Sequence, residues 1–271
     1  MTLKEKYTSI KEKPEAILAT NFYNFETLRA EMEAAAHLQK PIILQLTQSS
    51  IDYMGLENAV NMGKIALQYY DVEGWIHLDH GGSVELAKKC IDAGFDSVMF
   101  DGSELPLEQN MELTRKVVKM AAEEDICVEA ELGYIAKLGQ STEKMEHTTA
   151  EDAQAFSEAT GIDALAIAIG TAHGFYKSEP KLDFTRLAEI KAATNVALVL
   201  HGGSGVPHEA VKKAVELGIK KLNVATEIKN AFMMTLKDLL SNNEEIDLRK
   251  VFPPAIQIVK ELVEGKLLLV S

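Results

Sequence analysis

The amino-acid sequence predicts an α/β fold, a closed (β/α)8 TIM barrel in a single domain that spans residues 1–271. The first observation is that eight short strand-like runs alternate with helix-like stretches along the chain. The second is that runs such as ALAIAI and VALVL are apolar throughout, which is typical of parallel strands covered on both faces. The third is size, because 271 residues with 46% hydrophobic content suit one barrel-sized domain.

An open, doubly wound sheet is the alternative fold. Such sheets normally contain fewer strand–helix units and often carry a glycine-rich phosphate turn after the first strand. Here the first strand-like run is followed by Asn21, Phe22, Tyr23 and Asn24, without a glycine. The closed barrel is therefore favoured.

The strand-like runs are short and mostly apolar. In chain order they are Ala16–Thr20, Pro41–Leu46, Gly74–Leu78, Asp96–Phe100, Ile126–Leu132, Ala164–Ile169, Val196–Leu200 and Lys221–Val224. The helix-like stretches that follow them are Asn24–His37, Leu56–Gln68, Val84–Asp92, Leu107–Glu123, Ala150–Thr160, Phe184–Ala193, His208–Leu217 and Ile228–Leu240. A last amphipathic stretch, from about Val251 to Leu262, predicts a helical extension at the carboxyl end.

Composition narrows the class of protein. The formal net charge of -13 argues against nucleic acid as a partner, because a broad basic surface is then lacking. Cys90 and Cys127 lie in apolar segments and are interpreted as reduced core residues. The amino-terminal segment has no signal-peptide core and no apolar run is long enough to cross a bilayer, so we expect a cytoplasmic protein without a membrane partner.

Polar residues that could take part in chemistry fall at or just after the ends of the predicted strands. In a barrel these ends converge at one mouth, which is where barrel enzymes place their active sites. In strand order the residues are Asn21 and Asn24, Thr47, Asp79 and His80, Asp101, Glu131, His173, His201, and Asn223 and Thr226.

Three of the seven histidines have strand-end settings, in LDHGG, TAHGF and LHGGSG. Neutral imidazole is a good zinc ligand, and three protein ligands leave one position open for a substrate. We therefore predict a metal site formed by His80, His173 and His201, with a hydrogen-bonded structural role as the alternative for each histidine alone. The other histidines have settings inside strands, helices or loops; they are His37, His77, His147 and His208.

The acidic residues at the mouth have two interpretations each. Asp79 precedes His80 and could transfer a proton beside the metal, or it could cap a helix. Asp101 and Glu131 could orient the histidines, hold a second cation, or tie loops together. Glu129 shares the strand face of Glu131 and should also point into the barrel.

Two small-residue loops favour a phosphate site after the seventh and eighth strands. Gly202, Gly203 and Ser204 form one loop, and the segment 223–226, Asn-Val-Ala-Thr, forms the other; each leads into a predicted helix. Backbone N–H groups at helix amino termini bind phosphate, and barrels often place such a site here.

These residues also carry a family resemblance. The motifs NFYNFE, HLDHGG, SVMFDGS, VEAELG, AIAIGTAHG, LVLHGGSG and KLNVATE occur in this order, from about Ala16 to the carboxyl-terminal helix. Together they resemble the class II fructose/tagatose-bisphosphate aldolase family. The segments ATGIDALAIAIGTAHG and NVATE are more similar to its tagatose-bisphosphate branch.

The resemblance implies an activity and a set of roles. It implies reversible cleavage of a ketose (bis)phosphate, a sugar phosphate, into dihydroxyacetone phosphate and an aldehyde, with Zn2+ on the three histidines stabilising an enediolate. It implies that Asp79 takes the proton from the C4 hydroxyl, and that a monovalent cation, Na+ or K+, lies near the phosphate. The residues it implies for holding dihydroxyacetone phosphate are Gly174, Gly202, Ser204, Asn223 and Thr226. The predicted substrate and phosphate site adds the strand-end residues Asn21, Asn24 and Thr47 and the loop residues Gly203 and Ala225.

The sequence departs from the family pattern in three places. The proton donor of the family lies in a loop after the ELG motif; here that loop offers Glu143, with Glu146 or a merely solvated acid as alternatives. Ala225 stands where fructose-bisphosphate members have an aspartate. No arginine matches the one that some relatives use for the distal phosphate, so the aldehyde half is open and could be sulfonated or acidic.

Two other functions are alternatives to that of an aldolase. One is a metal-dependent epimerase that shares a histidine-rich mouth, and the other is a non-catalytic regulatory barrel subunit. The subunit would be expected to lack metal ligands or Asp79, and this chain keeps them all. A homodimer or homotetramer is the expected assembly, by resemblance.

Overall fold

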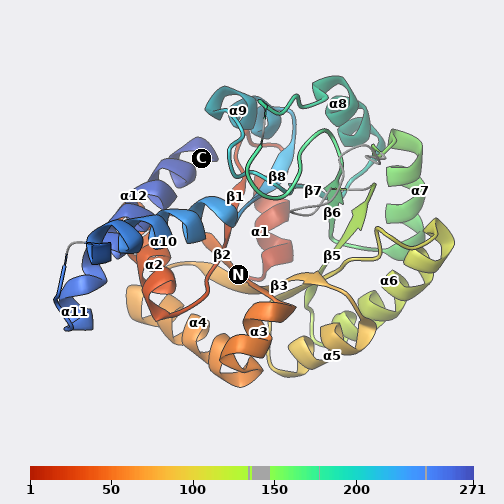
Figure 1. Cartoon of the computed structure of the whole chain (residues 1–271). Helices are drawn as coiled ribbons and strands as arrows, with labels where there is room; N and C mark the ends of the chain where they lie inside the picture. The colour runs from red at the N-terminus through yellow and green to blue at the C-terminus, as the bar shows by residue number, and fades with distance from the viewer. Residues whose placement is uncertain (134, 136–146, 177, 242) are drawn as a thin grey trace.

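The computed structural model describes residues 1–133, 135, 147–176, 178–241 and 243–271. Within them, parallel strands pair in chain order from β1 to β8, and β8 pairs back with β1, so that the sheet closes (Figure 1). The strands are β1 Ile17–Asn21, β2 Ile42–Thr47, β3 Gly74–Gly81, β4 Ser97–Phe100, β5 Cys127–Leu132, β6 Ala164–Ile167, β7 Ala197–Leu200 and β8 Ile219–Val224. The predicted (β/α)8 barrel is confirmed.

The helices form an outer ring around the strands (Figure 1). Those that follow strands are α2 Phe25–Leu38, α3 Gln48–Met54, α4 Leu56–Tyr70, α5 Val84–Asp92, α6 Leu107–Ala122, α7 Ala150–Thr160, α8 Phe184–Ala193, α9 His208–Glu216 and α10 Thr226–Ser241. Three lie outside the repeating units: α1 Leu3–Ile10, α11 Leu248–Val251 and α12 Pro253–Leu269.

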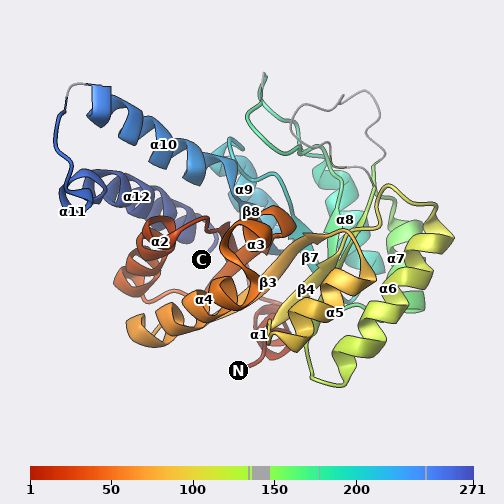
Figure 2. The ribbon, with the colours of Figure 1, turned by 60° about the horizontal axis from the view of Figure 1, so that its bottom comes forward.

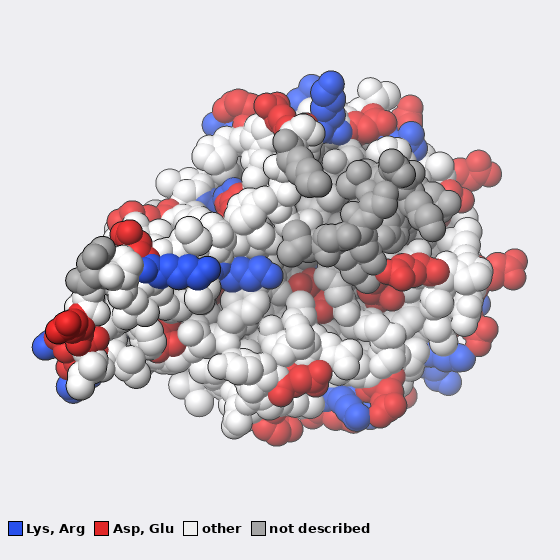
Figure 3. Space-filling model, viewed as in Figure 1, with Lys and Arg blue, Asp and Glu red and all other residues white. Residues whose placement is uncertain are grey.

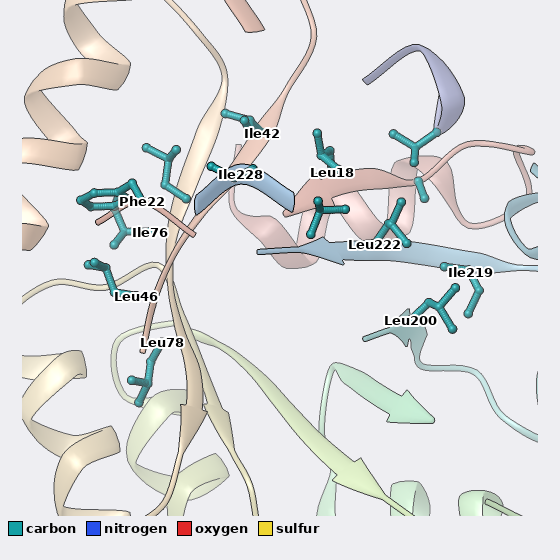
Figure 4. Packing of buried hydrophobic residues seen from close by; sticks show 14 of the residues in the cluster. Leu18, Phe22, Ile42, Leu46, Ile76, Leu78, Leu200, Ile219, Leu222 and Ile228 are labelled. Atoms are coloured by element: carbon teal, nitrogen blue, oxygen red, sulfur yellow. The ribbon is translucent and has the colours of Figure 1, made fainter. Parts of the chain in front are cut away.

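The main core lies between the strands and the helices. Because successive strand residues alternate in direction, one set points outward to the helices. Leu18, Ile42, Ile76 and Leu222 belong to this set and are fully buried, and Ile228 of α10 packs in the same cluster (Figure 4). The inward set is thereby left to line the barrel and the site at its mouth.

The amino-terminal helix α1 closes one end of the barrel, which we call the floor. Leu3, Tyr7 and Ile10, spaced at helical intervals, are buried against inward residues of the strands, including Ile17 and Trp75. The helix begins with a capping box between Thr2 and Glu5. Figure 2 shows α1 at the bottom of the molecule, opposite the loops that follow the strands.

The carboxyl-terminal extension is longer than the sequence predicted. Helix α12 runs to Leu269 and packs against α2 and α10, and the hairpin of α10 to α12 projects from the barrel (Figures 1 and 2). Pro253 begins α12, where its missing N–H costs nothing. The short helices α1, α3 and α11 were not predicted.

Candidate metal and substrate site

Three histidines meet at the carboxyl-end mouth of the barrel. His80 lies near the end of β3, His201 directly follows β7, and His173 lies in the loop after β6. One ring nitrogen from each lies within 4.8 Å of the others, and His80 Nε2 is 3.1 Å from His201 Nδ1. Two nitrogen ligands of one tetrahedral zinc ion lie roughly 3.3 Å apart. The donor set therefore fits a zinc ion.

A β-bulge allows Asp79 and His80 to face the mouth together. In a regular strand adjacent side chains point to opposite faces. The register between β3 and β4 shifts between Leu78 and Gly81, and His80 has a φ of 52°, in the left-handed region. Such strain in a non-glycine residue is maintained only where surrounding structure fixes it, and it clusters at functional sites.

Carboxylates fix the orientation of two of these histidines. His80 Nδ1 is 2.8 Å from Asp101 Oδ2, so its Nε2 is left to face the metal position. His201 Nε2 is 2.9 Å from Glu129 Oε1, so its Nδ1 faces that position instead. His80, Asp101 and Glu131 also form a second group of potential cation ligands. The predicted orienting role of Asp101 agrees with this geometry.

A buried charged network lies directly beneath the histidines, inside the barrel. Glu129 Oε2 is 2.6 Å from Lys221 Nζ, which lies 3.1 Å from His77 Nε2, and His77 Nδ1 is 2.8 Å from Ser97 Oγ. All four side chains are essentially inaccessible to solvent. A buried carboxylate needs such a partner, and Lys221 supplies it.

Asp79 is held ionised between two asparagines. Its Oδ2 accepts a hydrogen bond from Asn21 Nδ2 at 2.8 Å, and its Oδ1 lies 3.5 Å from Asn223 Nδ2. Burial opposes ionisation, but the nearby charges of His80 and Lys221 and the hydrogen bond from Asn21 outweigh it and lower the pKa of Asp79. Asp79 is therefore a carboxylate that can accept a proton near neutral pH.

Burial and nearby charges also determine the pKa values of His80 and His201. Burial disfavours the protonated ring of His80, but Asp79, Asp101 and Glu131 raise its pKa to about 9. Burial and the charges of His80 and Lys221 lower the pKa of His201. The surplus of carboxylates around these rings is an environment that favours a bound cation.

The two predicted phosphate loops are joined to each other. Gly203 N–H donates to the carbonyl of Asn223 at 2.9 Å, and Glu227 N–H donates to Ser204 Oγ at 3.2 Å. Gly202 has a φ of +67°, and a Cβ there would lie 2.5 Å from the carbonyl oxygen of Ala172. Glycine is therefore required where the loop after β7 meets the loop that carries His173.

Two predicted substrate residues are used as helix caps. Asn24 Oδ1 accepts from Thr27 N–H at the start of α2, and Thr47 Oγ1 accepts from Ser50 N–H at the start of α3. Capping accounts for one interaction of each side chain, and substrate binding by Asn24 and Thr47 stays a prediction. Glu143 and Glu146 lie outside the described residues.

Three other predicted residues lie in or directly after the loops that follow β6 and β8. Gly174, in the loop after His173, has a φ of 99°, Ala225 follows β8, and Thr226 is the first residue of α10. Among the described residues, the Oδ1 atoms of Asn21 and Asn223 and both amide atoms of Gln45 are buried without a hydrogen-bond partner. Buried polar groups of this kind are usually satisfied by a ligand or water.

Sequence reasoning missed Lys221 as a site residue and Tyr176 altogether. Lys221 lies in a predicted strand, and its inward direction follows from the same alternation that places Glu129 inside the barrel. Tyr176 OH accepts from Ala172 N–H at 2.9 Å and donates to the Gly202 carbonyl at 2.8 Å. It thereby ties the His173 loop to the His201 loop, a contact that leaves no signal in the sequence.

The surface around the mouth carries both signs of charge. Figure 3 shows acidic and basic side chains dispersed around the rim of this face.

Among the described residues, no helix has the length and apolar character that a membrane crossing requires.

Comparison with known proteins gives concordant matches over the full chain. Residues 1–271 match the family model described as fructose-bisphosphate aldolase class-II. The chain is 40% identical over 275 residues to the fructose-bisphosphate aldolase of Staphylococcus aureus strain Mu50, covering 98% of this chain and 96% of that protein. The corresponding protein of Staphylococcus epidermidis is 39% identical with the same coverage. The crystal structure of the YdjI aldolase from Escherichia coli K12 matches with a TM-score of 0.89 and 32% identity, over 99% of this chain and 96% of that chain.

Proposed function

The chain belongs to the class II fructose-bisphosphate aldolase family, and we propose that it reversibly cleaves a ketose (bis)phosphate into dihydroxyacetone phosphate and an aldehyde. Its general activity is thus that of an aldolase, a carbon–carbon lyase. The observation that carries the proposal is the convergence of three histidines within 4.8 Å beside the buried carboxylate of Asp79.

The metal is proposed to be zinc, which class II aldolases use. His80, His173 and His201 would hold it, with His80 through Nε2 and His201 through Nδ1. When bound, the ion polarises the ketone carbonyl and stabilises the negative charge that develops as the carbon–carbon bond breaks.

Asp79 is proposed as the base of the cleavage direction. It accepts the proton of the C4 hydroxyl, the bond between C3 and C4 breaks, and C4 leaves as the aldehyde carbonyl. In the condensation direction Asp79 returns that proton. Its hydrogen bond from Asn21 keeps the carboxylate directed toward the mouth and stabilises its charged form.

The phosphate of the dihydroxyacetone half is proposed to bind the loops after β7 and β8. The candidate residues are Gly174, Gly202, Gly203, Ser204, Asn223, Ala225 and Thr226. Support comes from the start of α10 at Thr226, because the amino terminus of a helix attracts anions. A monovalent cation beside this phosphate stays a prediction.

The remaining assignments of the reaction are also predictions. Glu143 is proposed to return a proton to the dihydroxyacetone carbon, and Asp101 and Glu131 to orient His80 or hold a second cation. Ala225 favours a substrate other than fructose 1,6-bisphosphate, so tagatose 1,6-bisphosphate and ketose phosphates with sulfonated or acidic aldehyde halves stay open.

We also propose a symmetric homodimer or homotetramer in the cytoplasm. Four large side chains of α2, α3 and α4 support an intersubunit contact: Phe25, Tyr53, Ile65 and Tyr69 are 60%, 79%, 66% and 80% exposed. Apolar groups exposed together in this way are typical of an interface. Sedimentation velocity should give a dimer or tetramer that Ile65→Lys weakens; a wild-type monomer would exclude it.

The substrate is tested by following dihydroxyacetone phosphate release from a panel of ketose phosphates through coupled NADH oxidation. The panel pairs the C4 epimers fructose and tagatose 1,6-bisphosphate and adds a sulfonated ketose 1-phosphate. We expect release from at least one member, with the fastest substrate defining the aldehyde half. Asp79→Ala is the control for contaminating activity. No release from any member by zinc-loaded, folded protein would contradict the proposal and favour the regulatory subunit.

A further inference from the structure

A cavity at the opposite end of the barrel from the histidines is lined by a cluster of lysines. It lies between α1, the carboxyl end of α8 and the beginnings of β6, β7 and β8, and its volume is about 320 Å3. Figure 2 shows its wall, α1, at the bottom of the molecule, away from the mouth. Lys4, Lys11, Lys191 and Lys220 line it, together with a single carboxylate, that of Asp163.

The lysines of this cavity are only partly neutralised. Lys4 lies 3.3 Å from Asp125 and 3.7 Å from Asp163, so both carboxylates form ion pairs with the same lysine. Lys11 Nζ donates to the neutral amide of Asn195 at 3.2 Å. Lys220 Nζ donates to the backbone carbonyls of Lys13 and Glu15. Four ammonium groups lie near the two carboxylates that pair with Lys4 and near the exposed acid Glu12, which leaves a surplus of positive charge in a chain whose net charge is -13.

The ammonium groups of Lys191 and Lys220 repel each other. Lys220 is only 4% exposed, and burial together with the charge of Lys191 lowers its pKa. The acids that oppose this are Glu12, which is exposed, and Glu15, which pairs with Lys13 at 3.4 Å. Bringing like charges together around a cavity raises the energy of the empty protein, and an anionic ligand relieves it.

We propose that this floor cavity binds a small phosphorylated metabolite, with Lys11, Lys191 and Lys220 holding its phosphate. A phosphate monoester carries close to two negative charges at neutral pH and would neutralise this surplus. Lysine ammonium groups bind phosphate as point charges with freely rotating donors. The cavity volume exceeds that of a phosphate group alone and falls at the lower end of the range of small-molecule sites. The site is separate from the mouth, so it stands whether or not the aldolase proposal holds.

The test is equilibrium dialysis of the full-length protein with radiolabelled inorganic phosphate at constant ionic strength, with no turnover required. The floor variant is Lys11→Met/Lys191→Met, which keeps the aliphatic stems, including that of Lys191 against Gly218. The matched control is Lys88→Met/Lys116→Met, which removes two exposed lysines elsewhere. Ser204→Ala alters the proposed phosphate loop at the mouth, so it distinguishes phosphate binding there from phosphate binding at the floor.

We expect wild-type protein to bind phosphate in a class of sites whose dissociation constant rises at least tenfold in the floor variant. That class should be unchanged in the Lys88/Lys116 control and in Ser204→Ala. Phosphate binding by the floor variant equal to that of wild type, or no saturable binding by wild type, would overturn the proposal. If the double variant does not fold, the milder Lys191→Gln should still weaken binding severalfold, and equality with wild type would again overturn it.

Discussion

Glu31 is a fully buried acid on α2 whose ionisation should contribute to the pH dependence of folding. Its side chain is not exposed, and neither carboxyl oxygen has a hydrogen-bond partner among the described residues. Burial raises its pKa from 4.5 to about 8; the hydroxyl of Thr20 lies close enough to oppose part of this rise, without the geometry of a hydrogen bond. We therefore predict that Glu31→Gln stabilises the protein at neutral pH.

The magnitude follows from the two pKa values. Because the pKa of Glu31 is higher in the folded state than in the unfolded state, the folded state binds the proton more tightly. The contribution of the protonated carboxyl group to the free energy of unfolding is complete below pH 4.5. It is lost as the pH rises and is gone above about pH 8. pH 7 lies roughly 2.5 pH units above the unfolded pKa of Glu31. Ionisation therefore lowers the free energy of unfolding at pH 7 by at most about 3 kcal/mol. Glutamine stays neutral throughout and escapes this loss.

The assay is equilibrium unfolding in urea, followed by circular dichroism at pH 5, 6, 7 and 8 on metal-free protein. The free-energy difference between Glu31→Gln and wild type should grow in favour of the variant by about 1.4 kcal/mol per pH unit up to pH 8. Glu33→Gln is the matched control, because Glu33 is a partly exposed acid of the same helix paired with Arg29, and should change stability by less than about 1 kcal/mol. A difference independent of pH would refute the assignment of a raised pKa to Glu31.

Three further predictions concern the mouth of the barrel. His201→Ala should lose zinc in metal analysis together with nearly all activity, and retention of both would remove His201 from the ligand set. Asp79→Ala should keep zinc but slow carbon–carbon cleavage by roughly a hundredfold to ten-thousandfold, because a proton-transfer group is lost; an unchanged rate would exclude Asp79 as the base. Lys221→Met leaves Glu129 buried without its cation and should weaken zinc binding about 10–100-fold in a chelator competition, whereas unchanged affinity would separate Lys221 from the metal site.

The fold could be predicted from the sequence because apolar runs and helix formers alternate so regularly. Helices α5, α7 and α8 begin and end where the sequence predicted. Strand β6 ends two residues early, at Ile167, although Ala168 and Ile169 are equally apolar and buried. Apolar character marks burial in that segment but not where strand pairing stops.

The unpredicted helices α1 and α3 are short. Helix α1 offers only Leu3, Tyr7 and Ile10 as an apolar face within a lysine- and glutamate-rich segment, and its stability comes from packing on the barrel floor. Helix α3 spans seven residues and buries only Ser50 and Ile51. Local sequence carries little signal for such elements.

The convergence of His80, His173 and His201 could be predicted because each lies in a histidine–glycine motif at or after a strand end. The contacts among Glu129, Lys221 and His77 could not, because strand alternation gives the inward direction of a side chain but not which inward side chains meet. The capping roles of Asn24 and Thr47 were accessible in principle, since each precedes a helix by one residue.

The most direct test of the central assignment is dihydroxyacetone phosphate release by the same protein before chelation, after chelation and after zinc is added back. The three-histidine site predicts that chelation abolishes release from the best substrate of the panel and that zinc restores it. Release that survives complete removal of the metal would contradict a metal-dependent aldolase at this site.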